Sequence, residues 1–168
     1  MIPLPDRIPT LTITDDANQT RISLSWMHRM AHAHCAEPEM VELARSIVAG
    51  IPNEDAIGMA QAVQDWIRAQ ITYRSDPAQT QYLQDVPVTL TSGSGNCDCM
   101  TILATCLMRA LGHDAFPLGV IWSGGTDATH AVCWDDTAGA ILDPVSGGPV
   151  RSWPPSHAQL GAFVAGGF

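Results

Sequence analysis

The sequence predicts an α+β fold, with helices first and an antiparallel sheet after them. Apolar residues recur at helical spacing between residues 20 and 70, and again after Cys97. Short alternating or apolar runs separated by turn residues follow residue 115, as is typical of antiparallel strands. The helix after Cys97 is apolar over most of its circumference, so we expect it to be buried at the centre of the fold.

Three helices are expected in the N-terminal half. Their predicted extents are residues 20–34, residues 38–50, and a stretch that begins after an N-cap at Asn53 and ends before Ile71. Residues 75–95 are rich in polar side chains and carry two prolines, so they are predicted to form a long loop. Residues 11–14 alternate in polarity and suit either a short strand or an extended arm.

The second half is predicted to open with the buried helix, which runs from Cys97 until Gly112 ends it. Strands are predicted at residues 116–122, 129–134, 140–142 and 150–153. At 168 residues the chain suits a single domain. We divide it into an N-terminal helical region (1–50), a core (51–155) and a tail (156–168), of which residues 161–168 are small, Gly-rich and expected to be loose.

The charge balance excludes several classes of function. All 8 cationic side chains are Arg, the formal net charge is -9, and no basic run exists, so neither nucleic acid nor an anionic membrane is an expected partner. The absence of Lys excludes a Schiff base or a P-loop lysine.

The chain starts without a signal-peptide pattern and has no apolar run of about 20 residues. We therefore expect a cytoplasmic protein whose 5 cysteines, an odd number, are free thiols.

Cys97 stands where a glycine-rich segment, Gly93-Ser94-Gly95-Asn96, leads into the buried helix. The first turn of a helix has unpaired backbone N–H groups and a partial positive charge, which we expect to stabilise a thiolate. An N–H group at the same turn can also face a developing oxyanion. The alternative is that Cys97 is a small buried core residue, as free cysteines usually are.

His130 and Asp143 are the candidate partners of this thiol. His130 opens one predicted strand and Asp143 directly follows the next, so antiparallel pairing would bring them together. The alternatives are a core histidine and an aspartate that merely forms a turn before proline. Taken together, the three residues suit a nucleophile, a base and a group that orients the base.

Three motifs in order resemble the core of the transglutaminase-like superfamily. They are Gly95-Asn96-Cys97 followed by a small and aliphatic run to Arg109-Ala110-Leu111-Gly112, then His130-Ala131, then Leu142-Asp143-Pro144. The segment from Trp66 to Pro77 is similar to the region before the nucleophile in bacterial and phage-borne members. The resemblance covers residues 55–145 and implies a papain-like core, in which the nucleophile helix packs on an antiparallel sheet.

This resemblance implies a role for each matching residue. Cys97 takes the position of the nucleophile, His130 that of the general base and Asp143 that of the orienting acid. Gln84 lies where members place a side chain that stabilises the oxyanion, with Gln81 as its rival, and Asn96 is a further candidate for substrate contact.

The expected activity is acyl transfer through a thioester on Cys97. We favour hydrolysis of peptide or carboxamide bonds in a peptide or protein substrate, because nothing in the sequence marks a site for an amine acceptor. The alternatives are a protein-glutamine transglutaminase or deamidase, and a non-catalytic or metal-stabilised interaction module, such as part of a phage-like particle. No cofactor is expected, and the oligomeric state is left open.

Two clusters of potential metal ligands have simpler interpretations. Cys97, Cys99, Cys106 and Cys133 lack the paired knuckles of zinc modules. His28, His32, His34 and Cys35 share the end of the first predicted helix, where histidines also complement the helix dipole. We therefore expect no metal. The five tryptophans are dispersed and are expected to form core or cleft wall.

Overall fold

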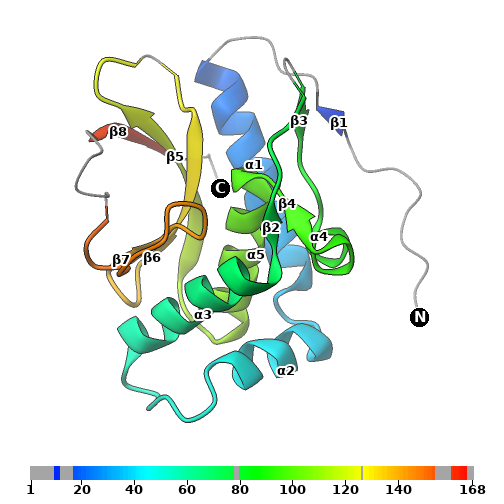
Figure 1. The fold of residues 1–168 in the computed structure, drawn as a ribbon, viewed down its shortest axis with the longest axis vertical. Coiled ribbons are helices and arrows are strands. Elements are labelled where there is room, and N and C mark those ends of the chain that lie inside the picture. Colours follow the sequence, from blue (N-terminus) through cyan, green and yellow to red (C-terminus); the bar gives the residue numbers. More distant parts are fainter. Residues whose placement is uncertain (1–9, 12–16, 78–79, 126, 154–159, 166–168) are drawn as a thin grey trace.

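The computed structural model describes residues 10–11, 17–77, 80–125, 127–153 and 160–165. The helices are α1 (Ala17–His34), α2 (Pro38–Ile47), α3 (Ala56–Gln70), α4 (Val86–Ser92) and α5 (Cys97–Ala110). Helix α5 lies at the centre and packs against both the sheet and the other helices (Figure 1). The predicted α+β plan, helices first and an antiparallel sheet after them, is confirmed. Within the described residues, no helix combines the length and apolarity that crossing a membrane requires.

The main sheet is antiparallel and has the strand order β7-β6-β5-β8. Its strands are β5 (Ala115–Trp122), β6 (His130–Asp135), β7 (Ala140–Leu142) and β8 (Leu160–Ala165). Two predictions were wrong here. Residues 150–153 form no strand, because a turn closed by the Ser152 N–H on the Pro149 carbonyl occupies them. The expected loose tail contains β8, which pairs with β5 and so gains backbone hydrogen bonds that a Gly-rich composition does not reveal.

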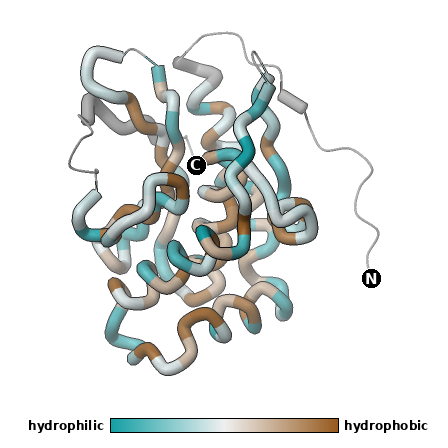
Figure 2. The backbone as a smooth tube through the Cα atoms, in the orientation of Figure 1, coloured by the Kyte–Doolittle hydropathy of each residue, from teal (hydrophilic) through white to brown (hydrophobic). Residues whose placement is uncertain are grey.

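Helix α5 forms the centre of the hydrophobic core. Every residue from Asp98 to Met108 is buried. The helix contacts α1, α2, α3 and α4 as well as β5 and β6. Each fully buried Leu, Ile or Met contributes about 1.5 to 3 kcal/mol to folding, so this helix is fixed in place by its surroundings. The outer helices, in contrast, alternate hydrophobic and hydrophilic residues along their length (Figure 2).

The segment before α5 is more ordered than the predicted loop at residues 75–95. It contains β3 (Gln81–Tyr82), α4 and β4 (Ser94–Gly95). Strand β4 pairs in parallel with β2 (Thr72–Tyr73), and β3 pairs with β1 (Thr10–Leu11). Asp85 caps α4, and Gly93 ends it at a φ of 61°. The polar and Pro-rich composition concealed this order, because such short elements carry too few residues to show a period.

Asn96 sets the start of α5. Its side-chain oxygen accepts a hydrogen bond from the Cys99 N–H at 2.9 Å, which is N-cap geometry. Its amide nitrogen donates to Asp76 at 2.7 Å and to the Tyr82 carbonyl at 3.1 Å. The buried Asn96 side chain therefore fixes both the first turn of α5 and the preceding segment that contains Asp76 and Tyr82. The N-cap of α3 differs from the prediction. Asn53 was the predicted cap, but the side chain of Asp55 caps this helix by accepting a hydrogen bond from the Gly58 N–H.

We predict that Gly95→Ala destabilises the protein, because an added Cβ would lie 2.6 Å from the Cβ of Cys99 in the first turn of α5. The expected loss is about 1 to 3 kcal/mol of unfolding free energy, typical of overpacking in a rigid site. Urea denaturation measures it. Ser94→Ala, in the same short strand, is the matched control and should change stability by less than about 0.5 kcal/mol. Equal stability of the two variants would contradict this account.

Candidate active site

Cys97 is the first residue of α5, and its thiol faces the start of β6. The backbone N–H groups of Asp98 and Ala131 both act to lower the pKa of this thiol. The thiol lines a cavity of about 210 Å³ together with Gln81, Asp98 and His130. Cys97 therefore lies at an accessible hollow between helix and sheet, and not among the apolar side chains inside the core.

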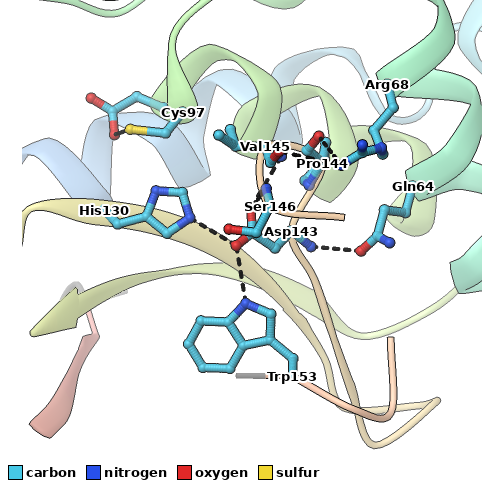
Figure 3. Close-up of polar contacts among 10 residues, drawn as sticks. Gln64, Arg68, Cys97, His130, Asp143, Pro144, Val145, Ser146 and Trp153 are labelled. Carbon is cyan, nitrogen blue, oxygen red and sulfur yellow. Dashed lines mark hydrogen bonds and ion pairs between the residues drawn. The ribbon is translucent and has the colours of Figure 1, made fainter. Parts of the chain in front are cut away.

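His130 and Asp143 are brought together by the pairing of β6 with β7. The Nε2 atom of His130 lies 2.9 Å from Oδ2 of Asp143. In Figure 3 the imidazole lies between Cys97 and Asp143. The ring of Trp122 stacks on the imidazole, with 6.2 Å between centroids and an interplanar angle of 15°. The structure thus places the three sequence-predicted triad residues around one site.

Asp143 is fully buried, yet its surroundings favour the carboxylate. Burial alone would raise its pKa, but hydrogen bonds from His130, Trp153 and the Ser146 N–H, with the charge of His130, outweigh burial and lower the pKa to about 2. Trp153 Nε1 donates to the same oxygen that His130 contacts, at 3.0 Å. Because an ionised carboxylate only accepts, Nε2 of His130 carries the hydrogen, and Nδ1 is left as the basic nitrogen.

Helix α3 holds the turn that carries Asp143. Gln64 accepts from the Asp143 N–H at 2.8 Å and donates to the Gly148 carbonyl at 2.6 Å. Arg68, one helical turn later, donates to the carbonyls of Pro144 and Val145 at 3.3 and 3.2 Å (Figure 3). Gln64 is buried, so its amide exchanges no hydrogen bonds with water. The position of the acid is therefore set by two side chains of a different layer.

The expected stabilisation of a Cys97 thiolate was wrong for this structure. Burial and the adjacent Asp98 carboxylate raise the pKa of Cys97 to about 12, although the N–H groups of Ala131 and Asp98 oppose them. The thiol therefore keeps its proton at neutral pH. A helix start favours a thiolate only where the sulfur remains solvated and no like charge adjoins it.

The three predicted candidates for oxyanion or substrate contact lie in different places. Gln81 lines the cavity with Cys97, and its amide nitrogen donates to Asp98. Gln84 lines a separate polar cavity of about 160 Å³, and its backbone N–H donates to the Cys99 sulfur at 3.4 Å. Asn96 lines that second cavity too, and its side chain is occupied as the cap of α5.

Three residues around the site, Gln64, Arg68 and Trp153, were not assigned a role in it from the sequence. Gln64 and Arg68 were hidden in an ordinary amphipathic helix, and only their i, i+4 spacing shows that they share a face. Trp153 was expected only to be core or cleft wall. Asp98 adjoins the nucleophile, and its neighbouring position was the one available signal that it reaches the same cavity.

In the part of the chain that the structure describes, no group of three or more His, Cys, Asp or Glu side chains is arranged so that it could hold a metal ion. The rings of His28 and His32 stack with centroids 6.1 Å apart, and the Cys35 sulfur lies 3.4 Å from the His32 carbonyl. His34 instead contacts the carboxylates of Glu37 and Asp85.

Comparison with known protein families gives a match over much of the chain. The model of the transglutaminase-like superfamily matches residues 41–139, which is more than half of the chain. That range includes Cys97 and His130 and stops before Asp143. No curated protein sequence matches the chain.

Two solved structures are similar in fold. One is a candidate protease of Parabacteroides distasonis, with a TM-score of 0.56 and 15% identity over 80% of this chain and 26% of that one. The other is a candidate cysteine protease of Cytophaga hutchinsonii, with a TM-score of 0.51 and 20% identity over 78% of this chain and 43% of that one. The chain thus spans less than half the length of either protein.

Asp143 is expected to make stability depend on pH below pH 5. Because its pKa falls to about 2 in the folded state, the carboxylate stabilises the fold above the unfolded-state value near 4. This contribution, about 2 to 3 kcal/mol, is about half lost by pH 3 and vanishes below pH 2. Asp143→Asn, which cannot titrate, should therefore show a shallower acid limb in urea denaturation between pH 5 and 2.5. Parallel curves for the two proteins would rule this out.

Proposed function

Because the chain belongs to the transglutaminase-like superfamily, we propose that it is a cysteine-dependent acyl-transfer enzyme that hydrolyses peptide or carboxamide bonds. One observation supports this proposal above all. A thiol at a helix start and an imidazole share one cavity, and the far nitrogen of that imidazole binds a buried carboxylate. This is the arrangement of nucleophile, base and orienting acid that cysteine catalysis requires.

The first half of the reaction forms a thioester. Since the Cys97 thiol is neutral at rest, Nδ1 of His130 takes its proton as the sulfur attacks the carbonyl carbon. Asp143 offsets the positive charge that then develops on the imidazole. The sulfur–carbon bond forms, the carbon–nitrogen bond breaks, and His130 gives its proton to the departing amine.

Water completes the reaction in the second half. It gives a proton to His130 and attacks the thioester carbon, and the sulfur leaves and recovers its proton. We favour water over an amine because the fold is shared with two candidate proteases. Transfer to an amine, or deamidation of glutamine, would use the same first step and differ only in the acceptor.

Gln81 is the proposed source of an oxyanion contact. Its amide nitrogen carries two hydrogens, and one of them is engaged by Asp98. The second can serve a negative oxygen that forms next to Cys97, since both side chains line the same cavity.

We predict that Cys97→Ala and His130→Ala each lower the rate at which the protein cleaves a peptide library by at least about a thousandfold. With iodoacetamide, Cys97 should react faster than Cys99 and Cys106 in the wild type, because those two side chains are buried in the core. His130→Ala should slow that reaction, because it removes the group that accepts the thiol proton, and acidic pH should slow it too. Mass spectrometry of the labelled peptides measures the rates. Equal rates for all three thiols would indicate a non-catalytic module, and incorporation of a labelled amine would indicate transamidation.

Gln81 and Gln84 form a matched pair for testing the oxyanion contact. Gln81→Leu should lower kcat by about a hundredfold with little change in KM, because the lost donor acts mainly in the transition state. Gln84→Leu removes the same amide from a side chain that lines the other cavity, and it should leave kcat within about threefold. The reverse order of effects would assign the oxyanion role to Gln84.

A further inference from the structure

The cavity beside Cys97 is acidic and carries no cationic side chain of Arg or Lys among the described residues that line it. Among these described residues, Asp98 and Asp127 carry the carboxyl groups. Leu24 and Met27 form apolar parts of its wall, and both are almost fully buried. A substrate group that enters this space therefore meets negative charge beside hydrocarbon.

Asp98 is the carboxylate that matters most, because it is closest to the reacting atom. Its Oδ1 lies 3.8 Å from the Cys97 sulfur. Its other oxygen accepts from the Gln81 amide. Both partners are neutral, and the side chain is only 8% exposed. Burial raises the pKa of Asp98, although the hydrogen bond from Gln81 opposes this effect. A positive charge brought against this side chain would therefore favour its ionised form.

The position of Asp98 also opposes ionisation of Cys97 before a substrate binds. Negative charge next to the sulfur makes it harder for the thiol to lose its proton, and burial adds to the effect. A positive charge brought in by the substrate would offset Asp98 and ease proton transfer to His130. Binding and activation of the nucleophile would then be linked through a single carboxylate.

We propose that the cavity binds a cationic group of the acyl donor, an ammonium or a guanidinium, held against Asp98 close to the attacked carbonyl. The proposal rests on the function proposed above and names the class of substrate that the same site takes. Two sources share this chemistry, the α-ammonium of an N-terminal residue and a basic side chain. A volume of about 210 Å³ suits one residue, and its apolar wall suits the hydrocarbon part of a basic side chain.

The binding of positive charge can be tested without knowing the substrate. Cys97 is modified at pH 8 with 2-(trimethylammonium)ethyl methanethiosulfonate and, separately, with the anionic 2-sulfonatoethyl reagent. Each thiolate attack forms a mixed disulfide and releases methanesulfinate, so the two reactions differ only in the charge delivered. Tandem mass spectrometry separates Cys97 from Cys99, and each rate is divided by that of a small free thiol.

We expect the cationic reagent to be favoured at Cys97 by at least about tenfold, and added NaCl to reduce the ratio. Asp98→Asn, which retains an oxygen for Gln81, should bring the ratio close to that of the free thiol. Glu54→Gln removes the same charge at an exposed position outside the cavity and is the matched control. A wild-type ratio near one, insensitive to salt, would overturn the proposal even if Asp98→Asn fails to fold, and so would a high ratio that persists in folded Asp98→Asn.

Peptide substrates distinguish the two sources of charge. Replacement of arginine by citrulline at the residue whose carbonyl is attacked tests the side chain, and acetylation of the N-terminus tests the α-ammonium. One of these changes should lower kcat/KM by at least about tenfold in the wild type and by much less in Asp98→Asn. Cleavage that ignores both changes would overturn the proposal while leaving the hydrolase function intact. A cationic reagent ratio without cleavage of any peptide would instead overturn the hydrolase function.

Discussion

The hydrogen bond between a buried carboxylate and the His130 imidazole is the interaction on which the site depends. Asp143 is fully buried, and it remains ionised because donors surround both of its oxygens. That charge selects the tautomer of His130 and so directs the basic nitrogen away from Asp143. The rest of the site serves this contact: Trp122 covers the imidazole, Trp153 shares the carboxylate oxygen, and the side chains of α3 hold the turn.

The sequence predicted the parts of this arrangement that long periodic segments encode. The buried helix and the first three strands of the main sheet had strong patterns, and the positions of Cys97, His130 and Asp143 followed from where those elements begin and end. The order within residues 75–95 and the strand at residues 160–165 could not be predicted, because they are held by pairing with distant strands and not by their own composition. The network of Gln64 and Arg68 was hidden for the same reason, since their partners lie more than 70 residues away.

The electrostatics of the nucleophile illustrate a second limit. The position of a cysteine at a helix start is visible in a sequence, but the balance of burial, N–H groups and like charge is not. In this fold the helix is so enclosed that desolvation and Asp98 outweigh the two N–H groups facing the sulfur. The same enclosure that fixes Cys97 beside its base therefore opposes its ionisation, which leaves proton transfer to be coupled to attack on a substrate.

The raised pKa of Cys97 has a consequence for how the protein withstands oxidants. Hydrogen peroxide reacts with thiolates, and the first product, a sulfenic acid, leads on to irreversible sulfinic and sulfonic acids. Because burial also raises the pKa of Cys99, Cys106 and Cys133, none of these four sulfurs is a ready target at rest. A nucleophile that exposes its reactive form only while a substrate covers it would remain reduced between turnovers without a disulfide or a metal to protect it.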